Sequence, residues 1–349
     1  MKRKHAIKRT GAGTGTKSKE SEISQSGEQG QAENEVSSEG AELGHVSVLL
    51  QPAIYFLNID RDNEARRGGT YVDATLGLGG HSAAIAQRLG AAGRLICFDR
   101  DEQALRIAGE RLAALKSRLG AEAPRVELVH GRFSQVGEHV APGTLDGLLA
   151  DFGVNSIQLD DAARGFSFRA EGPLDMRMDQ AQSGRSADQV VNHLDEPTLA
   201  DVIYEFGEER RSRRIARAIV RARPIRNTAH LAEVVSAAVP AMYAKHKPGQ
   251  KRIHHATKTF QGIRMFVNRE LEEVEALLSQ APALLRRGGR LVAISFHSLE
   301  DRRVKDHMRE MAQQGAYELL TRKPVVADEQ EMERNPRSRS AKLRAAERI

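Results

Sequence analysis

The chain has 349 residues, which is ample for one large domain or two ordinary ones, and 40% of them are hydrophobic, enough for a real core. Its single cysteine, Cys97, excludes an internal disulfide framework and any metal or iron–sulfur site built from several cysteines, and it fits a reducing cytoplasm. The formal net charge of +6 mildly favours a polyanionic partner, and no apolar run approaches the roughly 18 residues of a membrane span. We therefore expect a cytoplasmic protein, monomeric or homodimeric, with no membrane segment and no metal site.

Residues 1–44 are expected to form a disordered N-terminal extension. Residues 20–42 contain seven Glu and no Lys or Arg, among Ser, Gln and Gly. Such a segment has too little apolar surface to offset the entropy that ordering would cost. It lacks the hydrophobic stretch of a secretory signal, and its acidic half argues against a mitochondrial presequence.

From His45 onward, the patterns of strands and helices alternate. We expect helices at 46–57, 79–90 and 102–120, and strands at 68–75, 93–101, 125–133 and 145–153. This alternation predicts an α/β fold with a doubly wound parallel sheet and helices on both faces. The strand "LDGLLADFG" is a nearly continuous apolar run, which is typical of a strand buried on both sides.

The alternation stops near residue 160. Residues 161–258 are rich in charge and mostly helical in character, without a convincing strand. A fifth core strand is expected at 290–298, and 318–326 with 340–349 could form a final antiparallel pair. We therefore predict an α/β core, residues 45–160 and 259–349, interrupted by an all-helical insertion domain, residues 161–258.

A glycine cluster marks the turn after the first predicted strand. Gly77, Gly79 and Gly80 allow a tight turn and close approach of backbone to a ligand, and the next helix presents free N–H groups there. Asp99 ends the second strand about 20 residues later, where a carboxylate can accept both hydroxyls of a ribose. The pair favours a nucleoside cofactor over the alternative, an ordinary turn in which Asp99 and Asp101 cap the next helix.

The residues around the turn favour S-adenosylmethionine over NAD. The spacing departs from the dinucleotide fingerprint, because Ser82 occupies the place of its third glycine. Asp73, before the glycines, suits a cationic ligand better than a diphosphate and could contact an ammonium group directly or through water. Phe133, after the third strand, could cover an adenine face or simply belong to the core.

The segment "ADFGVNSIQLD" leaves the fourth strand at the edge of the sheet where ligands bind. An exocyclic base amine is a poor nucleophile and needs an acceptor for its hydrogens, a role for Asp151 and Asn155. The alternative is that both only fix a loop through side-chain hydrogen bonds. Cys97 lies inside a predicted strand, so it is a poor candidate for the nucleophile of carbon methylation. In "SFHSLEDR", His297 could be a general base, but a helix cap by Ser298 is the plainer interpretation.

Three basic segments indicate a nucleic-acid partner. Residues 208–226 place Arg213, Arg217 and Arg221 on a helix beside an apolar stripe, and residues 245–258 contain Lys251 and Arg252. The C-terminal "NPRSRSAKLRAAER" is the third. A solvated helix with a Glu209–Arg213 pair is the alternative for the first segment.

The helix expected at 259–278 carries a polar stripe beside its apolar side. The polar residues are Gln261, Arg264 and Asn268. They could face either a cleft or solvent.

Several longer motifs resemble those of one known family, in order from His45 to the C-terminus. They include "YVDATLGLGGHS", "DFGVNSIQLD", "RGFSF", "PLDMRMD", "GEERRSRRIARAIV", "TFQGIRMFVNREL", "SFHSLEDR" and "NPRSRSAKLR". The family is the bacterial ribosomal RNA small-subunit (cytosine-N4)-methyltransferases. The resemblance implies a class I, Rossmann-like methyltransferase core with an inserted helical domain. It also implies methyl transfer from S-adenosylmethionine to N4 of a cytosine, cytosine 1402, in the decoding centre of 16S rRNA.

By motif match, the resemblance implies specific cofactor contacts. They are Gly79, Gly80, His81, Asp99, Phe133, Asp151 and Gln158. Two positions depart from the family pattern: Asn155 stands where Ser is usual, and His255 stands where Pro is usual. These departures concern the details of substrate contact rather than the core assignment.

Overall fold

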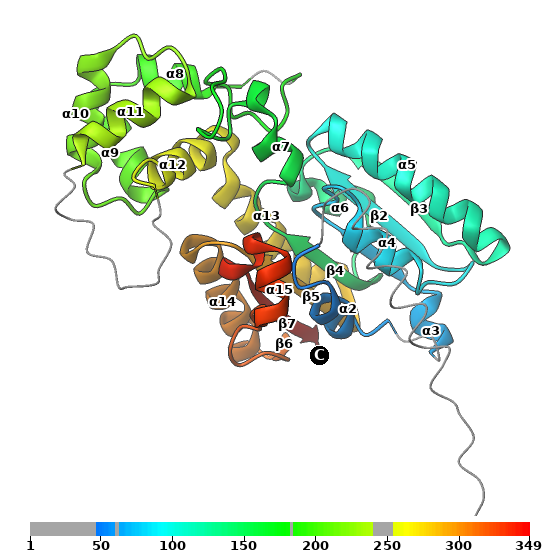
Figure 1. Ribbon diagram of the computed structural model, residues 1–349. Coiled ribbons are helices and arrows are strands. Elements are labelled where there is room, and N and C mark those ends of the chain that lie inside the picture. The colour runs from blue at the N-terminus through cyan, green and yellow to red at the C-terminus, as the bar shows by residue number, and fades with distance from the viewer. Residues whose placement is uncertain (1–46, 60–62, 182–183, 240–253) are drawn as a thin grey trace, which may run out of the picture.

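A single mixed sheet organises the protein (Figure 1). The computed structural model describes residues 47–59, 63–181, 184–239 and 254–349, so the predicted extension at 1–44 lies outside the described residues. Within these ranges, seven strands lie in the order β3-β2-β1-β4-β5-β7-β6. Their bounds are β1 Thr70–Asp73, β2 Arg94–Asp99, β3 Arg125–His130, β4 Leu145–Asp151, β5 Leu285–Ser295, β6 Tyr317–Leu319 and β7 Lys342–Arg348.

The first five strands are parallel, and β7 runs antiparallel between β5 and β6. Successive residues of the central strands point to opposite faces and enter two different hydrophobic clusters, as Leu148 and Leu149 do in β4. One face is covered by α2 (Leu50–Leu57), α4 (Gly80–Ala86) and α5 (Glu102–Leu119). The other is covered by α6 (Val136–His139), α13 (Glu270–Leu284) and α14 (Ser298–Gln313). The predicted Rossmann-like, doubly wound sheet is confirmed.

The helical part forms a second cluster beyond the carboxyl end of β4 (Figure 1). It is entered through α7 (Ser156–Asp160) and η3 (Ala162–Arg164). Its helices are α8 Ala187–His193, α9 Glu196–Glu205, α10 Ser212–Ala222 and α11 Thr228–Ala238. Apolar side chains on these helices build a core of their own, with Val190, Ile203, Ile219 and Leu231 all fully buried.

The return from the helical part is not the single helix expected at 259–278. The chain forms α12 (Thr257–Asn268) and α13, and Arg269 between them has a left-handed backbone with φ 53°. Phe260 and Ile263 of α12 belong to the hydrophobic core of the helical part, whereas α13 packs on the sheet. The chain therefore changes direction at Arg269 as it passes from one core to the other.

The predicted final strand pair is present but differs in length. β6 covers Tyr317–Leu319, and Val325 makes only an isolated bridge with Leu343. Between β6 and β7 lie α15 (Glu329–Arg334) and η5 (Pro336–Ser340). The backbone N–H of Leu49 donates to Glu331 Oε1 (2.6 Å), which fixes α15 beside the start of α2. The short connections α3 (Glu64–Arg67), η1 (Gly120–Glu122) and η2 (Phe133–Gln135) complete the core. No helix of the described ranges is long and apolar enough to cross a membrane.

Candidate active site

A cavity of about 890 Å³ opens at the carboxyl ends of β1, β2, β3 and β4, the edge at which doubly wound sheets bind ligands. It is lined by most of the predicted site residues: Gly80, His81, Asp99, Phe133, Asp151, Asn155 and Gln158. Residues from several further parts of the chain form its other walls: Ser47 and Val48, Arg169 and Met178, the helix α12, Phe296 and His297, and the segment 334–340. The fold therefore brings the sequence-predicted cofactor residues together in one place.

The glycine turn brings backbone to the cavity, and different structural requirements explain why Gly79 and Gly80 are glycines. Gly80 lines the cavity, and a Cβ there would meet Ser47 Oγ, well inside van der Waals contact. Gly79 is not among the lining residues; it has φ 76°, and a Cβ there would lie 3.0 Å from the Cβ of Ala108 in α5. Gly79 thus serves the turn and its packing on α5.

Asp99 holds the turn in place. Its Oδ2 accepts the N–H of Gly77 (2.8 Å), and its Oδ1 accepts the N–H of Asp101 (2.9 Å). Burial raises the pKa of Asp99 to about 6, and these two backbone donors act against that shift. Each carboxylate oxygen can accept a second hydrogen, so the bonds to the turn leave acceptor sites for the two ribose hydroxyls.

Asp73 lies below the cavity, not on it. It is fully buried, its Oδ2 accepts the hydroxyl of Ser82 (2.6 Å), and its Oδ1 accepts the N–H of Thr75 (3.1 Å). It is not among the residues that line the cavity. The interpretation of Asp73 as a direct contact for an ammonium group is therefore not supported. Ser82, which replaces a fingerprint glycine, has a structural role as the donor to this carboxyl.

Burial raises the pKa of Asp73 to about 6, so this carboxyl makes stability depend on pH. A carboxyl whose pKa is higher in the folded state stabilises at low pH and loses that contribution as pH rises through the folded value. Between pH 4 and pH 7 we expect Asp73 to cost about 2–3 kcal/mol of unfolding free energy, from a shift of about two pKa units.

Asp73→Asn should therefore lose less stability than the wild type between pH 4.5 and pH 7, as measured by denaturant unfolding of the unliganded protein at several pH values. Asp201→Asn, at an exposed position of α9, is the matched control and should follow the wild-type curve. Parallel curves for Asp73→Asn and the wild type would show that Asp73 is ionised throughout.

Asp151 presents an unused acceptor to the cavity. It ends β4, its backbone N–H donates to Thr75 Oγ1 (2.6 Å), and its side chain is 21% exposed. Its Oδ1 is buried and has no hydrogen-bond partner among the described residues. Burial, followed by the nearby Asp73 and Glu300, raises the pKa of Asp151 well above its ordinary value. A buried carboxyl oxygen without a hydrogen-bond partner lowers the stability of the folded protein. Such atoms are typical of functional sites, where a ligand supplies the missing hydrogen bond.

His81 stands beside this carboxyl. Its Nε2 lies 3.1 Å from the carbonyl oxygen of Val48, and its Nδ1 lies 3.6 Å from Asp151 Oδ2. Burial lowers the pKa of His81 to about 4, so the ring is neutral at pH 7. The neutral ring donates Nε2–H to the carbonyl, and its Nδ1 lone pair faces Asp151.

Asn155 has the loop-fixing role that was the alternative to a chemical one, and it also lines the cavity. It is the N-cap of α7, with its side chain accepting the N–H of Gln158 (2.9 Å), while Gln158 Oε1 accepts the N–H of Asn155 (3.1 Å). Ser and Asn are both favoured N-caps, so the departure from the family's Ser preserves this function.

A buried pair that the sequence did not reveal supports this wall. Asp101 Oδ2 accepts from both Gln158 Nε2 (2.8 Å) and Arg164 Nη1 (2.7 Å). Arg164 also donates to the carbonyl oxygens of Arg177 and Met178 (3.2 and 2.8 Å). Arg164 thereby connects the end of β2 to the first segment of the helical part. From the sequence, Asp101 was expected only to cap a helix, and it does cap α5.

Two of the three residues of the polar stripe on α12 face the cavity rather than solvent. Gln261 and Arg264 line the cavity, and Arg264 makes two bonds of 2.8 Å to the buried Glu270. Asn268 is buried instead: its Nδ2 donates to the carbonyl of Met176 (2.7 Å), and its Oδ1 accepts the N–H of Met178 (2.8 Å).

The cap of α14 lies one residue earlier than predicted. His297 is the N-cap, with Nδ1 accepting from the N–H of Glu300 (3.4 Å), and Ser298 donates to Glu208 instead. The other ring nitrogen, Nε2, lies 3.0 Å from Glu300 Oε1. Both nitrogens thus face groups of α14, which disfavours the general-base interpretation of His297.

Phe133 lies both at the cavity, as expected of an adenine contact, and against the hydrophobic core. It begins η2 and lines the cavity, while its ring packs against that of Phe152 at a centroid distance of 5.8 Å. It is only partly buried against the core. One part of the ring therefore contacts the core and another borders the cavity.

The predicted RNA-binding arginines of α10 lie away from this cavity. Arg213, Arg217 and Arg221 are exposed on the helical part, and none of them lines the cavity. Arg217 pairs with Glu196 (3.1 Å), whereas Glu209 lies beside Arg211 (4.0 Å) and not beside Arg213 as the alternative required. Lys251 and Arg252 lie outside the described residues.

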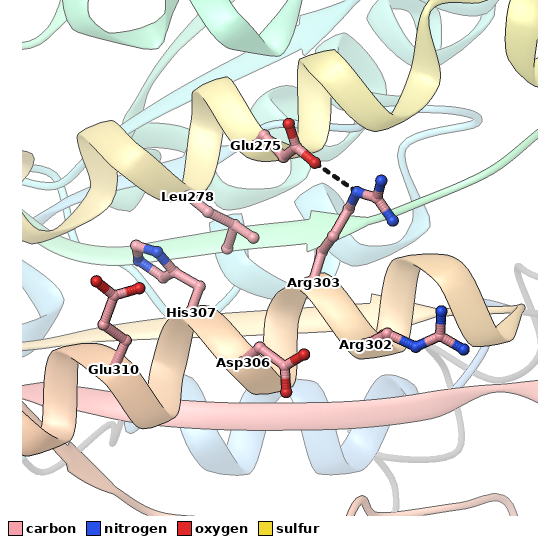
Figure 2. Close-up of a pocket in the computed structure, with 7 residues that line it drawn as sticks. All are labelled: Glu275, Leu278, Arg302, Arg303, Asp306, His307 and Glu310. Carbon is pink, nitrogen blue, oxygen red and sulfur yellow. Dashed lines mark hydrogen bonds and ion pairs between the residues drawn. The ribbon is translucent and has the colours of Figure 1, made fainter. Parts of the chain in front are cut away.

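A second, smaller cavity of about 300 Å³ lies between α13 and α14 (Figure 2). Its walls are mostly charged, and an ion pair between Arg303 and Glu275 (2.6 Å) crosses it. None of the predicted site residues that the structure describes lines it. The larger cavity is therefore the candidate active site.

Comparison with known proteins gives one consistent result. Residues 42–349 match the model of the MraW methylase family. The chain is 62% identical over 304 residues to "Ribosomal RNA small subunit methyltransferase H" of Acidobacterium capsulatum, covering 87% of this chain and 98% of that protein. It is 59% identical over 307 residues to the protein of the same name from Koribacter versatilis, covering 88% and 95%, respectively.

Proposed function

The chain belongs to the MraW methylase family, and on that premise we propose that it transfers a methyl group from S-adenosylmethionine to N4 of a cytosine in 16S rRNA of the small ribosomal subunit. By family resemblance the target is cytosine 1402 of the decoding centre. The class I methyltransferase fold supports this proposal, because its strand order places the glycine turn, Asp99 and Asp151 around one cavity.

The cavity suits S-adenosylmethionine, which when bound would supply a methyl group on a positively charged sulfur. Gly80 keeps the turn open at a position where a Cβ would collide with Ser47. Asp99 retains acceptor sites for ribose hydroxyls, and Phe133 lines the cavity with an aromatic ring suited to an adenine. The Oδ1 of Asp151, which is buried and has no hydrogen-bond partner in the described ranges, suits a cavity that receives a cation and an amine.

The strongest support for this proposal is the Oδ1 of Asp151, which is buried at the cavity and has no hydrogen-bond partner among the described residues. The N4 amine is a weak nucleophile because its lone pair is delocalised into the ring. Asp151 Oδ1 accepts a hydrogen of this amine, which orients its lone pair toward the methyl group. As the N–C bond formed and the carbon–sulfur bond of the bound cofactor broke, the amine would become acidic, and its proton would pass to the same oxygen of Asp151. The surroundings that raise the pKa of Asp151 make it a better proton acceptor than an exposed carboxylate.

Cys97 supports nitrogen rather than carbon methylation. It is fully buried in β2, and burial raises the pKa of its thiol far above the ordinary range. Carbon methylation of a pyrimidine needs a thiolate that reaches the ring. Since Cys97 is the only cysteine, that chemistry has no nucleophile in this chain.

The first test is transfer of labelled methyl from S-adenosylmethionine to small ribosomal subunits purified from a strain that lacks the modification, followed by nucleoside analysis. Label in N4-methylcytidine is the expected result. Label in another nucleoside would redirect the substrate assignment. Absence of transfer to subunits and to assembly intermediates, with cofactor binding intact, would contradict the proposed substrate.

We also propose that α10 contacts the RNA backbone through Arg213, Arg217 and Arg221. Charge-neutral replacement of Arg213 and Arg217 should reduce the salt slope of RNA binding by about 0.7–0.9 per lost phosphate contact. Titrations of RNA at several salt concentrations measure this slope. An unaltered slope would show that these arginines do not contact RNA phosphates and belong to a solvent-exposed helix surface.

A further inference from the structure

Three arginines from distant parts of the sequence meet at the large cavity. Arg169 follows η3, Arg334 ends α15, and Arg337 lies in η5. Arg169 and Arg334 are exposed, and Arg337 is half-buried. All three line the same cavity as Asp151, the residue of the proposed reaction centre.

The charges of these arginines are poorly neutralised by the protein. In contrast to Arg264, which is paired with the buried Glu270, Arg169 and Arg334 have no carboxylate partner in the part of the chain that the structure describes. Arg337 has one: its Nη2 lies 3.3 Å from both oxygens of Asp160, the last residue of α7. The side chain of Asp160 is 64% exposed, so this pair is solvated and adds little to stability.

We propose that Arg169, Arg334 and Arg337 form a phosphate-binding rim, which holds the RNA backbone on either side of the cytosine that enters the cavity. This inference rests on the proposed function and assigns residues to its substrate contact. A base that is turned out of its stack enters the site alone, and its flanking phosphates stay at the entrance. Planar guanidinium groups with several donors are well suited to bind those phosphates.

In this proposal, Arg337 exchanges its partner Asp160 for a phosphate when RNA binds. Without RNA, Arg337 donates to the two carboxylate oxygens of Asp160. A phosphodiester offers the same pair of acceptors, and the pair it displaces is exposed and weak. Asp160 therefore competes with RNA for Arg337, and its negative charge also repels the backbone.

Variants of the two residues of this ion pair distinguish a phosphate-binding role of Arg337 from a purely structural role. Arg337→Gln and Asp160→Asn break the same ion pair. If the pair only fixed η5 against α7, both variants would impair the enzyme in the same direction. If Arg337 binds phosphate, the two variants act in opposite directions.

The test measures binding of a labelled single-stranded RNA oligonucleotide that contains the target sequence, at several salt concentrations, together with KM and kcat on small ribosomal subunits. We expect Arg337→Gln to raise Kd and KM by roughly tenfold and to reduce the salt slope by about 0.7. Asp160→Asn should lower Kd and KM about two- to threefold with kcat unchanged, because one like charge leaves the entrance. Arg169→Gln and Arg334→Gln should resemble Arg337→Gln.

Arg309→Gln is the matched control. Arg309 is exposed on α14, well beyond His297 where that helix reaches the cavity, and its replacement should change neither Kd nor slope. Equal losses for Arg337→Gln and Asp160→Asn, or unchanged RNA affinity in all three rim variants, would overturn the proposal. RNA binding is scored without methyl transfer, so a wild type that binds with the expected slope but transfers nothing would contradict the proposed function and leave the rim standing.

Discussion

Asp151→Asn is expected to slow methyl transfer by about 10²- to 10⁴-fold, the usual contribution of a positioned proton acceptor. The amide keeps the size of the side chain but cannot take the proton that N4 loses. Folding should be unaffected, because Asn matches Asp in size and the Oδ1 of Asp151 makes no hydrogen bond among the described residues that the replacement would break. The measurement is the single-turnover rate on small ribosomal subunits at saturating cofactor, with unfolding curves to confirm equal stability.

Asp160→Asn is the matched comparison for this experiment, since it neutralises a second carboxyl that borders the same cavity. It should keep the wild-type rate constant at saturating RNA. A rate for Asp151→Asn within a few-fold of the wild type would remove Asp151 from the chemistry. The hydrogen acceptor would then have to come from another group on the cavity wall.

Arg164→Met is expected to destabilise the protein by about 3–5 kcal/mol, because it leaves the buried carboxylate of Asp101 without its cation. The side chains of Arg164 and Asp101 are only 7% and 6% exposed, so water cannot replace the guanidinium. Denaturant unfolding at pH 7 gives the loss. Cofactor affinity should fall as well, since the N–H of Asp101 is one of the two donors to Asp99.

The double variant Arg164→Met with Asp101→Asn should recover part of this loss, because the buried charge is removed together with its partner. Arg106→Met provides the surface comparison: Arg106 pairs with Glu110 at 3.0 Å, but both side chains are more than 60% exposed, and the cost should stay below about 0.5 kcal/mol. Similar small losses for Arg164→Met and Arg106→Met would mean that the buried pair contributes no more than an exposed one.

Much of the core could be predicted because its signals are local. The strand–helix alternation predicted β1 to β5, and the glycine turn with Asp99 predicted the position of the cavity. Motifs as long as "SFHSLEDR" made the family resemblance specific, and the family match confirms it. Asn155 shows the limit of such local signals, since the same hydrogen-bonding side chain suits a helix cap and a catalytic site.

The remaining features depend on contacts between distant segments. Arg164 meets Asp101 across 63 positions, and Arg337 meets Asp160 across 177, so no spacing pattern announces either pair. The direct ligand contact of Asp73 fails for a related reason: its position before the glycines suggested one, but its partner Ser82 in α4 holds the carboxyl below the cavity. The break at Arg269 follows from two competing cores, which helix propensity does not record.

The insertion of the helical part between adjacent strands has a consequence for the order of folding. β4 and β5 pair along their length, with Asp151 beside Ile294, yet the whole helical part separates them in the chain. Contacts between such distant residues form slowly, since loop closure must precede any gain from the pairing. Asn268 joins the outgoing segment at Met176 and Met178 to the returning α12, so the folded helical part holds its two ends together. Once that part has folded around its own hydrophobic core, the effective length of the connection between β4 and β5 is much shorter than the number of residues between them. The loop-closure cost of pairing the two strands falls accordingly.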